Sequence, residues 1–153
     1  MTHDEALRRA AAYCSQAEHC SFELTTKFNR WEVPVDEQRK ILEYLKKENY
    51  LNNERYAIAF ARDKFRYNKW GKIRLRMEMQ RKELSADDIA NALSVLDEDA
   101  YQQQATELAT AKLKSLKYKD SYERDGKLYR FLAGRGFESD VIRQAIQSAC
   151  KQD

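Results

Sequence analysis

The sequence predicts an all-α protein, an elongated array of three tandem three-helix repeats with nine helices. Glycine and proline are scarce, at 4 and 1 in 153 residues, where average usage gives roughly 10 and 8. This scarcity disfavours sheets joined by tight turns. Apolar residues recur at intervals of three and four along almost the whole chain, as amphipathic helices require. The apolar pattern also recurs at offsets of 51 and 53 residues, which is typical of helical repeats.

The expected helices follow from this periodicity and from residues that begin or end helices. Ser21, Asn53 and Ser85 can cap helix N-termini with side-chain oxygens, and Asn49 can end a helix in the left-handed conformation. Gly134 is expected to stop the eighth helix. The nine helices are expected over residues 4–14, 22–30, 36–48, 54–67, 72–83, 86–96, 97–116, 122–133 and 139–150.

The internal repeat rests on three sets of apolar residues with the same spacing. The intervals of four and five residues recur in Leu24, Phe28 and Val33, in Leu75, Met79 and Leu84, and in Leu128, Leu132 and Phe137. The agreement continues into the following helix, where Gln38 is the one polar exception. We therefore expect repeats over residues 1–50, 51–97 and 98–153, with Leu24, Leu75 and Leu128 buried in small cores that neighbouring repeats complete.

Positive charge is concentrated in one segment. Residues 62–82 hold nine Lys and Arg but two Asp and Glu, whereas the segments before and after it are slightly acidic. A local excess of this size indicates an anionic partner. Within the segment, Leu75 and Met79 are expected to point inward, and Lys72, Arg74 and Arg76 outward. Tyr67 and Trp70 lie between the cations, a combination that can bind phosphates and stack on bases.

Several function classes are disfavoured. We expect no secretory signal, because residues 1–5 have neither a basic nor an apolar character. No apolar run approaches the roughly 20 residues of a membrane span, so we expect a cytoplasmic protein without a membrane partner. The spacing of Cys14 and Cys20 is unusual for zinc, and we interpret the cysteines as small buried residues. No nucleophile, His and acid combination stands out. We therefore expect no metal, no cofactor and no enzymatic activity.

Four segments resemble a known family. They are Ser21–Phe28, similar to Ser-x-x-Glu-Leu-x-x-Lys-Leu; Asn49–Ala57, similar to Gly-Tyr-Leu-Asp-Asp-x-Arg-Phe-Ala; Trp70–Leu84, similar to Gly-x-x-Arg-Ile…Leu…Lys-Gly-Ile; and Leu132–Phe137, similar to Leu-x-x-Arg-Gly-Phe. These segments are signatures of the RecX family, bacterial regulatory proteins of the RecA recombinase. The resemblance extends from about residue 10 to 149. Glu83 stands where the family has glycine, so we expect a different backbone at that turn.

The resemblance implies a three-repeat helical fold and direct binding to RecA filaments. It also implies inhibition of the ATPase, strand-exchange and co-protease activities of RecA, without catalysis by the RecX protein itself. RecA regulation of this kind belongs to homologous recombination, DNA repair and the SOS response. We expect a monomer that contacts the RecA nucleoprotein filament, with single- or double-stranded DNA as a further candidate partner.

The candidate RecA- or DNA-binding residues form two basic groups. The first comprises Arg62, Lys64, Arg66, Lys69, Trp70, Lys72, Arg74, Arg76, Arg81 and Lys82, and the second comprises Lys112, Lys117, Lys127, Arg130 and Arg135. Three alternatives stay open: a general DNA- or RNA-binding protein that acts without RecA, a neutral adaptor scaffold, and a merely solvated helical face. Four tyrosines are assigned to packing instead of recognition: Tyr13, Tyr44, Tyr50 and Tyr56.

Overall fold

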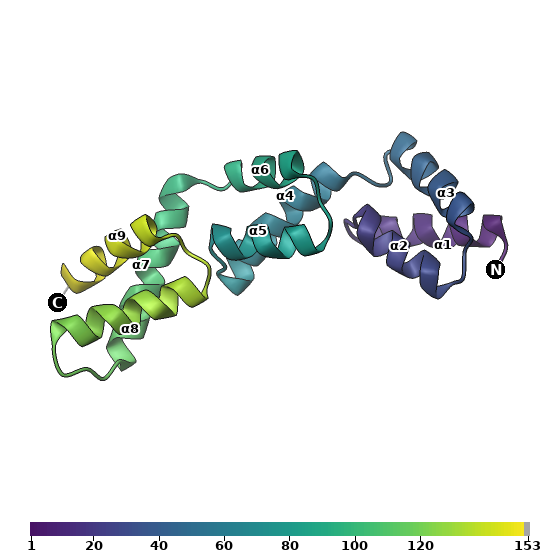
Figure 1. Cartoon of the computed structure of the whole chain (residues 1–153). Coiled ribbons are helices and arrows are strands. Elements are labelled where there is room, and N and C mark those ends of the chain that lie inside the picture. Colours follow the sequence, from purple (N-terminus) through teal and green to yellow (C-terminus); the bar gives the residue numbers. More distant parts are fainter. Residues whose placement is uncertain (152–153) are drawn as a thin grey trace. The chain divides into compact units, whose positions relative to one another are not determined.

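The computed structural model describes residues 1–151, and within that range it contains nine α-helices, one π-helical turn and no strand (Figure 1). This confirms the predicted all-α class. The elements are α1 (His3–Gln16), α2 (Ser21–Arg30), α3 (Val35–Lys47), α4 (Asn53–Asp63), η1 (Lys64–Asn68), α5 (Lys72–Arg81), α6 (Ala86–Ser94), α7 (Glu98–Ser115), α8 (Ser121–Gly134) and α9 (Ser139–Lys151).

The helix expected over residues 54–67 is not continuous. It changes at Lys64 into the π-helical turn η1, which ends at Lys69 in the left-handed conformation with φ 56°. The backbone N–H of Lys69 donates to the Lys64 carbonyl. A π turn inserts one residue into the helical register and often lies at functional sites. Apolar periodicity cannot reveal such a turn, because the pattern on both sides of it remains helical.

Two N-caps lie one residue before their predicted positions. Asn52, not Asn53, caps α4, with its Oδ1 accepting from the backbone N–H of Arg55 at 2.9 Å. Cys20, not Ser21, precedes α2, and Glu23 accepts from its backbone N–H at 3.3 Å. By contrast, Ser85 accepts from Asp88 N–H as expected of a cap.

The predicted repeat is visible in three equivalent turns, which follow α2, α5 and α8. In each turn an N–H donates back to the carbonyl five residues earlier: Val33 to Phe28, Leu84 to Met79, and Phe137 to Leu132. The residue before each of these donors has positive φ, at Glu32 (57°), Glu83 (55°) and Gly136 (95°). The expectation of a different backbone at Glu83 is therefore wrong, because Glu83 adopts the left-handed conformation at a cost of roughly 1–2 kcal/mol.

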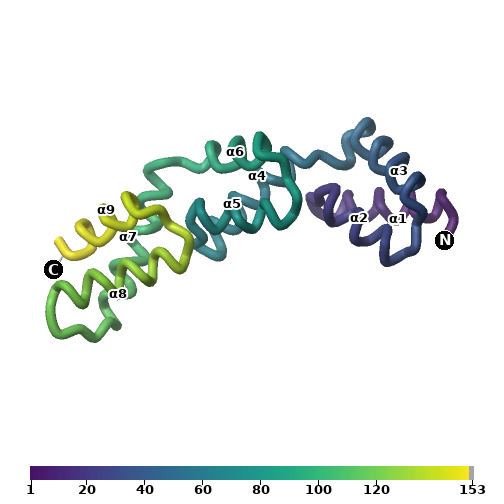
Figure 2. The backbone as a smooth tube through the Cα atoms, in the orientation of Figure 1, coloured from purple at the N-terminus to yellow at the C-terminus, as the bar shows by residue number. Residues whose placement is uncertain are grey.

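The chain forms two compact units. The segments of each can be located by residue number on the coloured backbone trace of Figure 2. The first unit contains residues 1–60 and 79–92, and the second contains residues 61–78 and 93–153. Each has its own apolar core, built around Leu24 and Phe28 in the first and around Leu132 and Phe137 in the second. The predicted burial of Leu24, Leu75 and Leu128 is confirmed, since none of the three is exposed.

In the second unit, α7, α8 and α9 pack against one another (Figure 1). In the first, α3 packs against both α1 and α2. Gln38, the polar exception of the repeat, is buried in α3, where its Nε2 donates to Asn29 Oδ1 and to the Val33 carbonyl, both at 2.8 Å. Two hydrogen bonds therefore offset the cost of burying an amide at an apolar repeat position.

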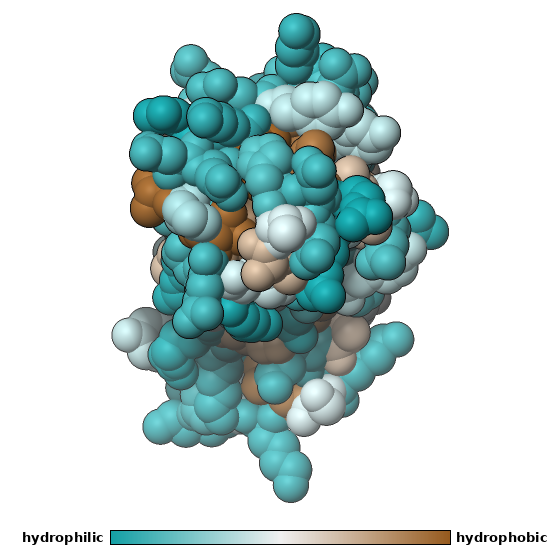
Figure 3. Space-filling view, turned by 90° about the vertical axis from the view of Figure 1, so that its right-hand side faces the viewer, coloured by the Kyte–Doolittle hydropathy of each residue, from teal (hydrophilic) through white to brown (hydrophobic). Residues whose placement is uncertain are grey.

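The tyrosine predictions are partly wrong. Tyr56 is buried and Tyr13 is half-buried, as expected, but Tyr44 and Tyr50 are 45% and 44% exposed. Tyr44 lies on the outer side of α3, while the core side is occupied by Ile41 and Leu45. The face shown in Figure 3 is mainly hydrophilic, with small separate hydrophobic patches.

Candidate functional site

The start of α5 is held by backbone and side-chain groups of α7 and of the loop between α8 and α9. Gly71 N–H donates to the Arg135 carbonyl at 2.8 Å, and Ile73 N–H donates to the Gly136 carbonyl at 2.9 Å. Between them, Lys72 N–H donates to Tyr101 Oη at 2.7 Å. The first amides of a helix have no partner within the helix. Here residues from the C-terminal part of the chain supply three acceptors, and this fixes the start of α5 within the second unit.

Two glycines allow this close approach. A Cβ at Gly71 would lie 2.4 Å from the Gly136 carbonyl carbon and oxygen, and one at Gly136 would lie 2.4 Å from the Arg74 Cβ. Gly136 also has φ +95°, a conformation that side chains rarely adopt. Gly136 therefore serves both the turn after α8 and the contact with α5.

Tyr101 is the buried polar centre of this junction. Its hydroxyl accepts from Lys72 N–H and donates to Glu138. Burial, together with the hydrogen bond to Glu138, raises the pKa of Tyr101 far above its usual range. Its ring stacks with Phe65 and contacts Phe137 at a centroid separation of 5.3 Å. The phenol therefore remains neutral at physiological pH and links α5, α7 and the start of α9.

The expectation that Lys72 and Arg74 point freely outward is wrong. Lys72 Nζ pairs with Glu98 at 2.8 Å and lies 4.6 Å from the centre of the Tyr101 ring. Arg74 stacks on Trp70 at 4.4 Å, and its Nε is buried without a partner among the described residues. Only Arg76 of this trio is exposed. Helical periodicity alone predicts that this side of α5 is exposed to solvent, but the α8–α9 loop covers it.

The junction brings parts of the two basic groups together. Lys64 and Arg74 both lie over Trp70, at 5.4 and 4.4 Å from its ring centre. Arg135 donates to the Asn68 carbonyl of η1 at 3.0 Å, which connects the second group to the first. Arg135 and Lys112 in turn both lie near Phe131, at 5.6 and 5.1 Å. Cation–aromatic contacts of this kind orient the charges.

Exposed cations and apolar side chains lie together on the segment from the end of α4 to α5. We call this set the η1–α5 surface: Arg62, Arg66, Tyr67, Lys69, Ile73, Arg76 and Met77, all exposed. Ile73 and Met77 are 50% and 43% exposed and stand four residues apart on α5. Sequence reasoning missed both, although their helical phase opposite Leu75 and Met79 was a usable signal.

The other predicted site residues lie elsewhere. Lys82 belongs to the first unit and pairs with Glu23 at 3.3 Å, and Arg81 also falls in that unit. Lys127 on α8 pairs with Glu123 and donates to the Lys117 carbonyl. Lys117 and Arg130 are exposed. The η1–α5 surface therefore contains four of the fifteen predicted residues.

Residues 1–151 contain no cluster of three or more His, Cys, Asp or Glu side chains that could hold a metal ion. The three cysteines are free thiols, and burial raises the pKa of both Cys14 and Cys20. No described helix combines the length and the apolar character needed to cross a membrane.

Comparison with known proteins identifies two domains. Residues 52–93 match the family model for the second three-helix domain of RecX, and residues 99–146 match the model for the third. The regulatory protein RecX of Chromobacterium violaceum is 32% identical over 95% of this chain and 91% of the relative. That of Ralstonia nicotianae is 34% identical over 92% and 86%.

The chain spans little more than half the length of some clostridial relatives. The regulatory protein RecX of Clostridium botulinum is 33% identical over 80% of this chain but 58% of its own length. Among solved structures, RecX from Lactobacillus salivarius matches 97% of both chains with a TM-score of 0.90 and 17% identity. A second crystal structure of a regulatory protein RecX has a TM-score of 0.85 and covers 95% of this chain. These structures support the fold.

Proposed function

Because the chain belongs to the RecX family of regulatory proteins, we propose that it binds the RecA nucleoprotein filament and inhibits the ATPase, strand-exchange and co-protease activities of RecA. It acts in the cytoplasm as a binding module, without catalysis and without a cofactor. The η1–α5 surface is the principal contact. Inhibition follows from occupying the filament groove or from blocking the addition of RecA at a filament end.

The observation that carries this proposal is the chemistry of the η1–α5 surface. Arg62, Arg66 and Arg76 are exposed, and none of them has an ion-pair partner among the described residues. Ile73 and Met77 supply exposed apolar area on α5, the helix that also contains Arg76. Protein interfaces commonly combine apolar anchors with arginine and exclude water around them. The charges accelerate encounter with an anionic filament, while the apolar residues favour a protein surface.

The junction at the start of α5 gives the η1–α5 surface a defined shape. The hydrogen bonds of Gly71, Lys72 and Ile73 fix the start of α5, and Arg135 fixes the end of η1. A surface that is ordered before binding loses less conformational entropy when the complex forms. Lys72, Arg74 and Arg135 support the binding surface by holding it in place, and the exposed arginines contact the filament.

A DNA-dependent RecA ATPase assay tests the proposal. The wild-type protein should inhibit hydrolysis, and the triple variant Arg62→Glu, Arg66→Glu and Arg76→Glu should not inhibit at the same concentration. The control variant carries the same charge change at exposed positions of the first unit, Arg8→Glu, Lys40→Glu and Lys46→Glu, and should still inhibit. Circular dichroism and thermal melting establish that both variants are folded. Inhibition by the folded η1–α5 variant at wild-type concentrations contradicts the proposal for this surface.

A second candidate function is binding to bare DNA or RNA without RecA. It is favoured by Trp70 and Tyr67, which lie among cations and offer rings to nucleobases. However, Trp70 is half-buried and has Lys64 and Arg74 over its ring, so Tyr67, at 69% exposed, is the more accessible stacking platform. A salt titration on bare single- and double-stranded DNA separates the two functions, because only this one requires tight binding in the absence of RecA.

A further inference from the structure

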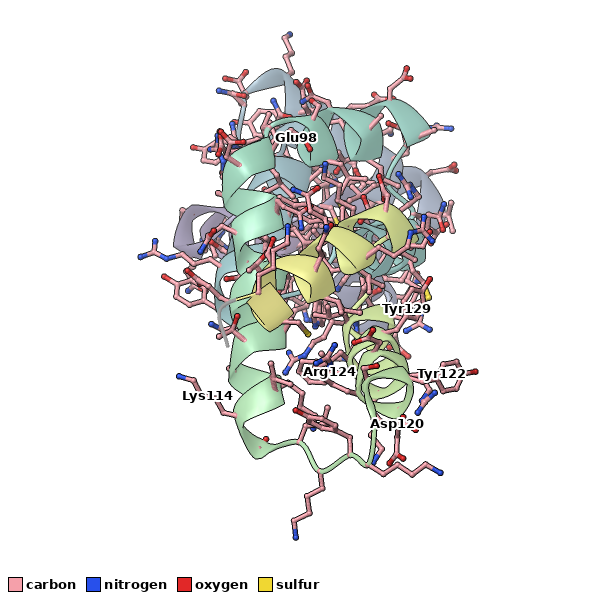
Figure 4. The ribbon with its side chains drawn as sticks, turned by 90° about the vertical axis from the view of Figure 1, so that its left-hand side faces the viewer. Glu98, Lys114, Asp120, Tyr122, Arg124 and Tyr129 are labelled. Carbon is pink, nitrogen blue, oxygen red and sulfur yellow. The ribbon has the colours of Figure 1, made fainter. Side chains whose placement is uncertain are left out.

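A groove of about 1010 Å³ lies along α8 and α9 in the second unit, apart from the η1–α5 surface. Its lining residues come from α8, from the chain just before it and from α9, and include Tyr129, Arg130, Arg143, Ile146 and Gln147. Figure 4 shows Tyr122 pointing away from the helices at the start of α8, whereas Arg124 points toward α7. The volume is large enough for several side chains of a bound peptide.

The acidic residues of the groove are engaged within the chain. Asp125 pairs with Arg124 at 3.0 Å, and Glu123 pairs with Lys127 at 2.9 Å. Asp120 accepts from the backbone N–H of Glu123 at 2.8 Å as the cap of α8. Three carboxylates are thereby held by internal donors, and their charge is partly compensated.

Apart from Arg124, the basic residues of the groove are not compensated in this way. Arg130 on α8 and Arg143 on α9 are both exposed, and neither has an ion-pair partner among residues 1–151. Lys119 and Lys151, also exposed, lie at the same groove. Four cations without ion-pair partners in the described part of the chain thus line a groove whose three carboxylates already accept internal hydrogen bonds, so the groove favours an anionic ligand.

The groove also has an apolar component. Ile146 is half-buried and packs against the core of the second unit. Tyr129 is 36% exposed and Tyr122 is 87% exposed. Since Ile146 stands three residues after Arg143 on α9, the apolar side chain and the guanidinium lie on neighbouring positions of one helix face.

We propose that this groove binds a short acidic peptide segment of a partner protein, with its carboxylates on Arg130 and Arg143 and an apolar side chain beside Ile146 and Tyr129. Arginine binds carboxylates with paired hydrogen bonds. A nucleic acid fits less well, because its phosphates are regularly spaced and some would face Asp120, Glu123 and Asp125. A peptide can place neutral residues opposite these acids. The proposal does not depend on binding to RecA.

Fluorescence anisotropy of the full chain with a fluorescein-labelled peptide, Asp-Glu-Phe-Asp-Glu-Leu-Asp-Glu, tests the proposal. The wild-type protein should bind this peptide, and Arg130→Glu with Arg143→Glu should weaken binding by roughly tenfold or more, since close interfacial charge pairs have this effect. Arg143→Gln alone should weaken it less. Lys46→Glu on α3, an exposed cation of the first unit, is the control and should bind as the wild type does.

Two further probes test whether the arginines recognise carboxylates and whether the ligand of the groove is a peptide or a nucleic acid. A peptide with every acid replaced by Asn or Gln should bind much more weakly, and equal binding overturns the assignment of the arginines. A labelled oligothymidylate should bind more weakly than the acidic peptide. Stronger oligothymidylate binding that is lost in the double arginine variant overturns the peptide proposal in favour of a nucleic acid. Unchanged peptide affinity in that variant, shown to be folded by circular dichroism, excludes the groove.

Discussion

The two compact units join neighbouring helices by different chemistry. In the first, side chains make the connection: Asn53 Oδ1 on α4 accepts from Ser21 N–H at the start of α2 at 2.9 Å, and Arg55 pairs with Glu18 at 2.6 Å. In the second, backbone groups make most of it, with Gly71 and Ile73 donating directly to carbonyls of the α8–α9 loop. A side-chain connection tolerates changes of sequence and responds to salt, whereas a backbone connection depends on glycine.

The difference also bears on function. The backbone connection includes the first residues of α5, among them Ile73 of the η1–α5 surface, and Lys72, Arg74 and Arg135 make internal contacts around it. Cations that appear equivalent in the sequence are therefore divided into supporting residues and exposed residues. A variant that reverses the charge of Lys72 and Arg74 would disturb the fold as well as the charge, so it cannot by itself report on binding.

The largest expected effect is that of adding a methyl group at the backbone connection. Gly136→Ala should destabilise the protein by about 3 kcal/mol or more, because the new Cβ would meet the Arg74 Cβ and N within 2.6 Å at φ +95°. Gly134→Ala, two residues earlier, is the matched control, since its Cβ would have no neighbour within 4 Å. Urea denaturation of the two variants measures the difference. Equal urea midpoints for the two variants would mean that Gly136 does not approach Arg74 this closely in solution.

A smaller loss is expected from Tyr101→Phe. The variant removes the acceptor of Lys72 N–H and the donor to Glu138, and leaving buried polar groups unpaired costs about 1–3 kcal/mol. Thermal melting at neutral pH measures this loss. A melting temperature equal to that of the wild type would contradict the central role of this hydroxyl.

The same variant should change the response to alkali. Because the pKa of Tyr101 is raised in the folded protein, its contribution to stability is fully present below about pH 10, the ordinary value for the unfolded chain. It is lost as the pH rises above that value, since the unfolded chain then releases a proton that the folded protein retains. Tyr101→Phe should therefore lose less stability than the wild type between pH 9 and 11. Burial also raises the pKa of Tyr56, so some alkaline sensitivity should remain.

The smallest expected effect concerns the side-chain connection of the first unit. Asn53→Ala should cost about 1 kcal/mol, because Ser21 N–H loses its acceptor at a half-buried position. The nearby ion pairs of Arg55 and Lys82 should weaken with added salt. Denaturation at low and high ionic strength measures both contributions. A loss as large as that of Gly136→Ala would remove the contrast between the two connections.

Much of the fold could be predicted from local patterns. The spacing of Leu24, Leu75 and Leu128 indicated the repeat because burial in each repeat is governed by the same helical period. Glu83 was harder to interpret, since a non-glycine residue can adopt the left-handed conformation when the surrounding turn compensates for the cost. The sequence does not distinguish Asn52 from Asn53 as the N-cap of α4, because either asparagine can cap a helix. Only the long-range hydrogen bond between Asn53 and Ser21 separates their roles.

The candidate site could be predicted only in part. The cluster of charge in residues 62–82 is a local property and was evident. The pairing of Lys72 with Glu98 and the contact of Arg135 with Asn68 join residues 26 and 67 positions apart, and helical periodicity contains no information on such pairs. For the same reason the exposure of Ile73 and Met77 depended on knowing which sides of α5 are covered.

The central claim, direct binding to RecA filaments through the η1–α5 surface, is tested most directly by co-sedimentation with RecA filaments preformed on single-stranded DNA. We expect the wild-type protein to sediment with the filaments but not with the same DNA alone, and to sediment less as salt increases. The Arg62→Glu, Arg66→Glu and Arg76→Glu variant should remain in the supernatant, while the Arg8→Glu, Lys40→Glu and Lys46→Glu control should sediment as the wild type does. Equal sedimentation of the two folded variants, or equal sedimentation of the wild type with bare DNA, would contradict this claim.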